Sequence, residues 1–516
     1  MSTAKSIEKL GNAIWVFLDA SGGFLCNKGI VATQVFGCLV LFLLGAGWTY
    51  GATKKVKQLR AAKSNSKTLA LSPDEKDMER PGVSIVLPVK GVRQHSVENW
   101  KTQLALNYEG NLEFIFVVES WQDLALAALT SVIQKFPKVK SRIEVAGPAK
   151  SSSQKIHNML HGLSTTSSTS KYVIFLDDDV ALHSRSASIL VDEIENDESV
   201  FLVTGYPFDI PLQSSNLLTY CTMAYHLPLM IPFSVASRTS FVWGGCMLLK
   251  RSDLLKADPY NIIGSWREGG YSDDLIMAGK CAENGLVIAV PTEAVFPQRL
   301  ESTPSWNNYW NYLRRQLYVC DTYASIRNKR INHTMVAVHV VSSIAFTTLM
   351  LGGIWRVLLW QIDLLSMLNR RVFSGEDASV DWPSAFDLSG CPASTFLTIS
   401  FLVTWIFATG GLVFITSTIL QYVQEMPAID SQQEKKETNL TEVESIQLDG
   451  LHYFKVWLGM LVTNGLLPIC ALYTFLEPTV SWSGLKYYRR NGKIIRVEPK
   501  LDLAEKAKAN LKKLNK

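Results

Sequence analysis

The chain has 516 residues, of which 47% are hydrophobic and 19% are charged, and its formal net charge is +5. A charged fraction below the roughly 25% of soluble domains indicates membrane segments, and this length predicts one sizeable globular domain with other material beside it. The small net charge, clustered rather than spread along one face, argues against nucleic acid as a partner. The eight cysteines include no C-x-x-C pair, so neither a zinc site nor a disulfide framework is readable.

The N-terminal part, residues 1–60, is expected to cross a membrane once. Residues 29–50 carry no charge and are long enough to span a bilayer. Four basic residues follow directly, at Lys54, Lys55, Lys57 and Arg60. By the positive-inside rule, the polar linker that comes next, residues 61–81, is expected to be cytosolic.

Residues 82–325 show the pattern of a globular α/β domain. Apolar runs typical of strands alternate with segments typical of helices, which predicts a mostly parallel sheet with helices on both faces. Ligands of such sheets bind beyond the carboxyl ends of the strands. The expected strands are Val83–Val89, Leu112–Val118, Ile143–Ala146, Tyr172–Leu176 and Phe201–Thr204, and the clearest expected helices are Trp121–Lys135 and Ser186–Asn196.

A second membrane region is expected over residues 326–485. Its predicted spans are 334–360, 396–422 and 456–476, with a flexible polar loop at 424–449. Strict alternation from the first span would leave the basic tail, residues 486–516, on the lumenal side, whereas its charge favours the cytosol. One segment is therefore expected to be re-entrant, broken or interfacial, and the run 456–476, interrupted by glycine and proline, is the first candidate.

Three consecutive acids, Asp177, Asp178 and Asp179, follow directly on the apolar run Tyr172–Leu176. Neighbouring carboxylates repel one another unless a positive group lies between them. In an extended backbone Asp177 and Asp179 point the same way, and two such carboxylates can hold Mg²⁺ or Mn²⁺ on a diphosphate. A solvated acidic turn is the alternative.

Two further strand ends carry residues suited to a nucleotide. Lys90 follows the first strand, where a nucleotide commonly meets such a sheet, although a plain strand-to-loop exit fits equally well. Glu119 follows the second strand, with Asp123 four residues later. These acids either accept hydrogen bonds from a base or ribose, or they cap the start of the next helix.

Later in the chain, Asp273 and Asp274 precede a segment with helical periodicity that ends near Gly285. One of these acids can take a proton from an attacking hydroxyl, or both can serve as helix caps. Arg314 and Arg315 lie among aromatic residues before a predicted span. Arginine suits diphosphate, and it also suits a membrane interface, where its charged end reaches water.

In this order, the acids and the arginine motif resemble the membrane-bound, family-2-like glycosyltransferases of the GT-A fold. Among these the chain is most similar to the ceramide glucosyltransferases of plants or algae, on the segment Tyr309-Trp-Asn-Tyr-Leu-Arg-Arg-Gln and on one leading span with several trailing spans. The run Pro478–Trp482 is a less specific match. The chain departs from the family motif (Q/R)xxRW, of which only Arg314 matches.

The resemblance implies roles for individual residues. Asp177 matches the second family acid with Asp179 as metal partner, and Asp274 matches the general base beside Asp273. Glu119 takes the place of the first acid, a role that Asp123 shares. The remaining assignments place Lys90, Asp178, Arg314 and Arg315 with the UDP-sugar, and His226, Trp310 and Trp482 with the acceptor. The alternative for His226, a lone histidine in an apolar stretch, is a structural group whose hydrogen bonds are satisfied within the protein.

The resemblance also implies a function. It is inverting transfer of glucose from UDP-glucose to the primary hydroxyl of ceramide, dependent on Mg²⁺ or Mn²⁺, at the cytosolic face of a Golgi or endoplasmic reticulum membrane. One alternative is a processive polysaccharide synthase of the chitin or hyaluronan type, which needs a polymer channel and usually the full Gln-x-x-Arg-Trp motif. The other is a non-catalytic membrane scaffold that retains a transferase fold.

Overall fold

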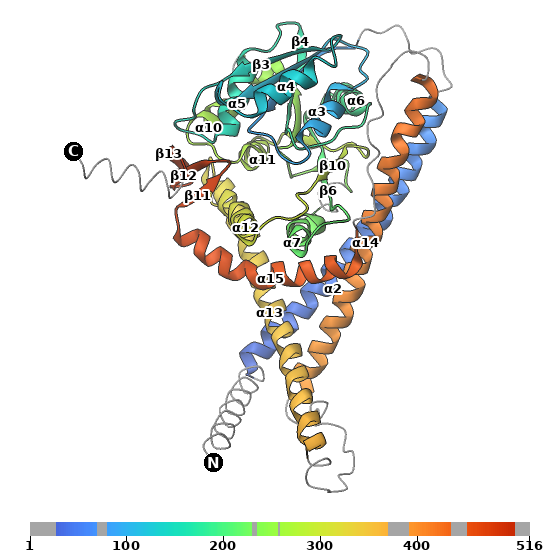
Figure 1. Ribbon diagram of the computed structural model, residues 1–516, viewed down its shortest axis with the longest axis vertical. Helices are drawn as coiled ribbons and strands as arrows, with labels where there is room; N and C mark the ends of the chain where they lie inside the picture. Colours follow the sequence, from blue (N-terminus) through green and yellow to red (C-terminus); the bar gives the residue numbers. More distant parts are fainter. Residues whose placement is uncertain are drawn as a thin grey trace, which may run out of the picture. The chain divides into compact units, whose positions relative to one another are not determined.

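The computed structural model describes residues 27–69, 80–229, 235–255, 258–369, 392–434 and 451–500. Part of the expected linker 61–81, most of the expected loop 424–449 and the end of the tail therefore lie outside the described residues. The described residues form two compact units. One contains the α/β domain, and the other contains segments of the apolar helices (Figure 1).

The α/β domain is built on an eight-stranded sheet in the order β3-β2-β1-β4-β8-β5-β9-β7. The expected parallel arrangement holds across β3, β2, β1 and β4, whereas β8 runs antiparallel to both β4 and β5. The strands are β1 (Gly82–Pro88), β2 (Leu112–Val118), β3 (Lys140–Val145), β4 (Ser170–Leu176), β5 (Val200–Thr204), β7 (Arg238–Thr239), β8 (Cys246–Lys250) and β9 (Val287–Ala289), and a parallel pair, β6 (Tyr206–Ile210) with β10 (Val295–Arg299), lies beside them.

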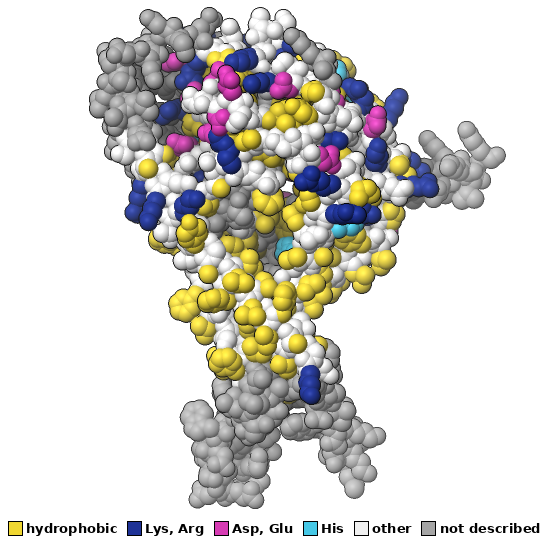
Figure 2. Space-filling view, turned by 180° about the vertical axis from the view of Figure 1, so that it is seen from behind, with side chains coloured by type: hydrophobic (Ala, Val, Ile, Leu, Met, Phe, Trp, Pro, Cys, Tyr) yellow, Lys and Arg dark blue, Asp and Glu magenta, His cyan; other side chains and the backbone are white. Residues whose placement is uncertain are grey.

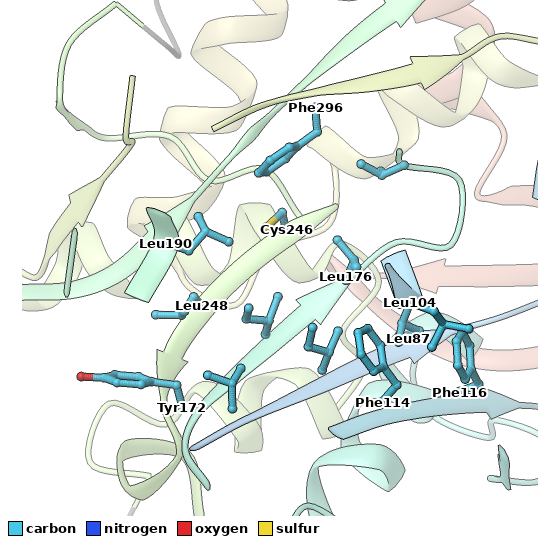
Figure 3. Close-up of a cluster of buried hydrophobic side chains, with 14 of the residues drawn as sticks. Leu87, Leu104, Phe114, Phe116, Tyr172, Leu176, Leu190, Cys246, Leu248 and Phe296 are labelled. Carbon is cyan, nitrogen blue, oxygen red and sulfur yellow. The ribbon is translucent and has the colours of Figure 1, made fainter. Parts of the chain in front are cut away.

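Alternate side chains of the central strands enter two different cores. Ile85 and Leu87 of β1 join Phe114 and Phe116 of β2 in one cluster, which Figure 3 shows from the side. Val86 lies in the second cluster, on the opposite face. Because successive residues of a strand point to opposite faces, a continuous apolar run means that both faces are covered. The expected strands that correspond to β1, β2, β4 and β5 are thus confirmed as buried strands. The expected strand Ile143–Ala146 corresponds to β3, an edge strand that is only partly buried.

Helices supply both covers. The first core receives side chains from α3 (Ser96–Leu104), α4 (Ala125–Ile133) and α6 (Ser186–Glu195). The second receives them from α5 (Gln154–Ser164), α10 (Ile262–Arg267) and α11 (Asp273–Asn284). Helices α7 (Leu217–His226) and α12 (Trp306–Cys320) pack against each other, and a short helix α9 (Arg251–Leu255) follows β8.

Within the described residues, four helices are long and apolar enough to cross a membrane, as expected of a membrane protein. They are α2 (Lys28–Leu69), α13 (Ile326–Asn369), α14 (Pro392–Glu434) and α15 (Tyr453–Leu476), and each contains one of the predicted spans. Helix α15 continues through Pro468 without a break. Figure 2 shows hydrophobic side chains covering the visible surface of the apolar helices, while Lys, Arg, Asp and Glu gather over the α/β domain.

The segment expected to be a basic tail begins as folded structure. Strands β11 (Thr479–Trp482), β12 (Leu485–Arg490) and β13 (Lys493–Pro499) form an antiparallel sheet. Its inward side chains include Leu485, Tyr487 and Ile494, which pack around Tyr271. The amide of Ile494 donates to the carbonyl of Gly269 at 2.9 Å, so β13 is tied to the loop that precedes α11.

Candidate active site

One half-buried cation joins two acids that lie about a hundred residues apart in the chain. The Nζ atom of Lys155 is 2.8 Å from Oδ1 of Asp177, after β4, and 3.0 Å from Oδ2 of Asp273, the first residue of α11. The same ammonium donates to the carbonyl of Gly244 at 3.0 Å. Lys155 sits in the first turn of α5, which begins at the cap Ser153. The structure therefore brings the second and third acidic groups of the sequence together around Lys155.

The electrostatics of this cluster are set by burial and by its lysine. Burial raises the pKa of the Asp273 carboxyl to about 7, although Lys155 opposes that rise. Burial likewise raises the pKa of Asp177, and Lys155 again acts in the other direction. For Lys155 itself, burial lowers the pKa, but the two carboxylates outweigh it and the net shift is upward. Lys155 thus stays charged, and it holds the pKa of both carboxyls below the value that burial alone would give.

The other two acids of the triplet face Arg93. This arginine pairs with Asp178 and lies 2.8 Å from Oδ2 of Asp179. Among the described residues, Oδ2 of Asp178 and Oδ1 of Asp179 are buried without a hydrogen-bond partner. Buried carboxylate oxygens that the protein leaves unpaired suit a hard divalent cation, which binds oxygen ligands. The described residues contain no group of three His, Cys, Asp or Glu that would hold a metal by themselves, as is common for magnesium sites completed by substrate phosphates.

Asp274 differs from Asp273 in its surroundings. Its Oδ1 accepts from Ser272 Oγ and, at 2.8 Å, from the amide of Leu275, and its side chain is half-buried. Ser272 is the N-cap of α11, and Asp274 is an acid of its first turn that accepts one of the amides there. This contact uses one carboxylate oxygen and fixes the orientation of the other.

The residues at the ends of β1 and β2 form a second polar cluster. Lys90 pairs with Glu119 and lies 3.8 Å from Oδ2 of Asp123. Oδ1 of Asp123 accepts from the amide of Gly91 and from that of Ala125, each at 2.9 Å. Asp123 therefore caps the helix entry, as the alternative interpretation held, and it also binds the β1 loop to the β2 loop.

The arginines of α12 lie against the C-terminal sheet and α15. Arg314 donates to the carbonyl of Thr479 at 2.8 Å and stacks over Tyr473. Arg315 stacks over Trp482 with its guanidinium carbon 4.1 Å from the ring centre. Burial raises the pKa of Tyr271, and Arg315 beside it opposes the rise. Arg315 is thus a neighbour of the loop that carries Asp273.

The predicted acceptor residues lie around the same helix. His226 is 3.1 Å from Oδ2 of Asp209 through Nδ1 and 3.2 Å from the hydroxyl of Tyr312 through Nε2. Trp310 packs against Tyr473 with ring centres 6.3 Å apart. His226 is thus a satisfied group, as the simpler interpretation expected, and its assignment to the acceptor stays a prediction.

Two residues of the site were missed from the sequence, Lys155 and Arg93. For Lys155 a signal exists: a cation in the first turn of a helix opposes the helix dipole, and such a local conflict often marks a functional residue. Arg93 stands in an ordinary polar loop, and no sequence pattern distinguishes it. The acids Asp178 and Asp179 are evident in the sequence, but the loop conformation that places Arg93 beside them is not.

A family model described as glycosyl transferase family 21 matches residues 40–393, which is more than half of the chain. The chain belongs to glycosyl transferase family 21. As a member of this family it is a glycosyltransferase, and its mixed, mostly parallel sheet with helices on both faces confirms the α/β architecture expected from the sequence.

Curated relatives match this family 21 glycosyltransferase over a shorter region. Ceramide glucosyltransferase 1 and ceramide glucosyltransferase 3 of Caenorhabditis elegans are each 26% identical to it over 136 residues. That region is 26% of this chain and 28% of each relative, so the chain matches under a third of their length.

Solved structures similar to the family 21 glycosyltransferase include other sugar transferases. The mannosyltransferase PcManGT from Pyrobaculum calidifontis, in complex with GDP-Man and Mn²⁺, is 14% identical with a TM-score of 0.35, and the match covers 76% of this chain and all of that one. GalNAc-T7 with UDP, GalNAc and Mn²⁺ is 13% identical with a TM-score of 0.31, covering 46% of this chain and 48% of that one.

Proposed function

We propose that the chain transfers glucose from UDP-glucose to the primary hydroxyl of ceramide, with inversion, at the cytosolic face of a Golgi or endoplasmic reticulum membrane. The observation that carries the proposal is the contact of Lys155 with both Asp177 and Asp273. It gathers carboxylates from separate segments at the carboxyl end of β4, where ligands of such sheets bind. Family membership and the names of the curated relatives support the substrates.

The donor would lie along the carboxyl ends of β2, β1 and β4. Glu119 and Asp123 offer acceptors to a base or ribose, with Lys90 between them. Asp177 and Asp179 would hold a divalent cation, and the unpaired oxygens of Asp178 and Asp179 fit such an ion. When bound, the cation supplies positive charge that stabilises the diphosphate leaving group.

Asp274 is the proposed general base. Its Oδ1 is held by Ser272 and by the amide of Leu275, which leaves Oδ2 to accept a proton from the primary hydroxyl of the acceptor. The hydroxyl oxygen then forms a bond to the anomeric carbon while the bond from that carbon to the UDP oxygen breaks, and the configuration inverts. Asp273 is less suited because Lys155 occupies its Oδ2.

The arginines and aromatic residues of the α12 region complete the proposed site. Arg314 and Arg315 would offset charge that develops on the leaving UDP. Trp310 and Trp482, together with His226, would contact ceramide as it arrives from the bilayer. These assignments rest on the position of α12 beside Tyr271, in the loop before Asp273.

The test uses Asp274→Asn, with Asp253→Asn as a matched control because Asp253 lies on α9 after β8, outside the proposed site. Membranes that contain each variant receive labelled UDP-glucose and ceramide. We expect Asp274→Asn to abolish transfer, at least about 10²-fold, while its UDP affinity stays within about twofold of wild type. Unchanged turnover would refute the assigned base.

The form of the product separates the proposal from its alternatives. A chloroform-soluble labelled lipid supports ceramide as the acceptor. An insoluble labelled polymer would instead identify a polysaccharide synthase, and the absence of any product in wild-type membranes that bind UDP would identify a non-catalytic scaffold.

A further inference from the structure

Three large apolar side chains are exposed at the rim of the Lys90–Glu119–Asp123 cluster. Trp121 is 70% exposed and Leu124 is 81% exposed, both on the loop after β2, and Val92, on the loop after β1, is 46% exposed. The two loops are joined by the Gly91–Asp123 hydrogen bond and by the Lys90–Glu119 pair. Large apolar side chains that are exposed together beside polar residues mark a candidate surface for ligand contact.

The indole of Trp121 is unusual for this domain. Trp100 and Trp266, in the two cores, are fully buried, as expected for the large apolar area of this side chain. Trp121 instead stands between two acids that face a proposed nucleotide, on a loop that hydrogen bonds hold in place. Its open ring face is available to another planar group.

The sheet order decides which part of the donor lies beside this loop. Strand β2 is separated from β4 by β1 alone, so the loop after β2 is about 10 Å from the carboxylates after β4. Those carboxylates, with Lys155, mark the reacting end. The opposite end of a nucleoside diphosphate sugar is its base. We propose that Trp121 stacks on the nucleobase of the donor while Glu119 accepts its hydrogen bonds, an inference that rests on the proposed function.

The two kinds of contact have different consequences. Stacking on an aromatic ring is tolerant of base identity because every base has a π face, whereas hydrogen-bonding groups discriminate between bases. Trp121→Ala should therefore weaken UDP and ADP by a similar factor. Glu119→Gln should instead change the ratio of the two affinities.

The experiment measures UDP and ADP binding to the full-length protein in detergent by titration calorimetry, without acceptor. We expect Trp121→Ala to weaken both nucleotides by about 5- to 20-fold, the lower part of the range for base stacking, and Trp121→Phe to restore most of the affinity. In Trp121→Ala the Michaelis constant for UDP-glucose should rise by a similar factor, while kcat and the Michaelis constant for ceramide stay within about twofold of wild type. The matched control is Trp306→Ala, an indole 49% exposed at the start of α12.

Each outcome decides something. UDP affinity of Trp121→Ala equal to wild type, in a variant that unfolds at the wild-type temperature, overturns the stacking role alone. A rise confined to the Michaelis constant for ceramide assigns Trp121 to the lipid and also overturns it. A wild-type protein that binds no UDP overturns the proposed function and this inference together.

Discussion

Replacing Lys155 with methionine removes the only charge that lies between Asp177 and Asp273 in the described contacts. Methionine keeps much of the volume but cannot donate to either carboxylate. The two contacts of Nζ, 2.8 and 3.0 Å, place the acceptor oxygens within about 6 Å of each other. With an effective dielectric constant of about 20, Lys155 attracts a carboxylate at about 3 Å by more than the about 3 kcal/mol with which the two carboxylates repel each other at about 6 Å. Without this attraction the pKa of the pair should rise by at least about 2 units.

The repulsion acts on a group that already titrates near neutrality. The pKa of Asp273 is about 7 with the lysine present, so an increase of about 2 units leaves on the order of 1% of it ionised at neutral pH. Asp273 adjoins the proposed base Asp274 and shares Lys155 with the proposed metal ligand Asp177. We therefore expect loss of the ionised pair to lower kcat/KM of Lys155→Met for glucose transfer, by up to about 100-fold near pH 7. Because deprotonation restores the carboxylate pair, activity should recover as the pH rises.

The assay is the pH profile of kcat/KM with labelled UDP-glucose and ceramide in proteoliposomes, with thermal unfolding to confirm folding. Lys171→Met is the matched control, since Lys171 makes a 2.6 Å ion pair with Glu195 in which its side chain is half exposed, and such pairs contribute little. A Lys155→Met profile that overlays wild type, in activity and in pH dependence, would refute the reasoning.

Three further predictions concern single residues. Burial lowers the pKa of His183 to about 4 from an ordinary 6.5. The stability that neutral His183 contributes is therefore present above about pH 6.5 and is lost as the pH falls toward about 4. From about pH 7.5 to about pH 5 the wild type should lose about 2 kcal/mol more unfolding free energy than His183→Gln in denaturant titrations. Gly244→Ala would place a Cβ 2.5 Å from Oδ2 of Asp273, and initial rates should fall about 10- to 100-fold with secondary structure retained by circular dichroism. Arg315→Lys keeps the charge but loses the planar stack on Trp482, so its melting temperature should fall, and an equal melting temperature would contradict that role.

The sequence was informative where side-chain burial determines structure. The apolar runs that became β1, β2 and β4 are buried on both faces, and the acids that follow them had to lie at one edge of the sheet. The family resemblance implied that Asp177 and the acids at the start of α11 act together, and the structure places Asp177 and Asp273 on one lysine. The identity of the group between them was not predicted, because Lys155 comes from a helix whose register on the sheet is a tertiary property.

The pattern of apolar residues could not predict the direction of β8 or the C-terminal sheet. The short run Cys246–Lys250 reads as a strand in either direction, and only the fold makes β8 antiparallel. In β12, charged residues dominate the composition, although Leu485 and Tyr487 alternate with more exposed neighbours. Net charge indicated a tail, while the alternation of buried side chains indicated a strand, and the packing around Tyr271 decided for the strand.

The bond between Ile494 and Gly269 has a consequence for how the protein is made. The loop before Asp274 leaves the ribosome more than two hundred residues before its supporting strand. At ordinary elongation rates that interval lasts roughly 10 to 45 s. A nascent chain therefore carries every carboxylate of the centre before it contains the strand that braces the loop, and the onset of sugar transfer is coupled to the synthesis of α15 and β13.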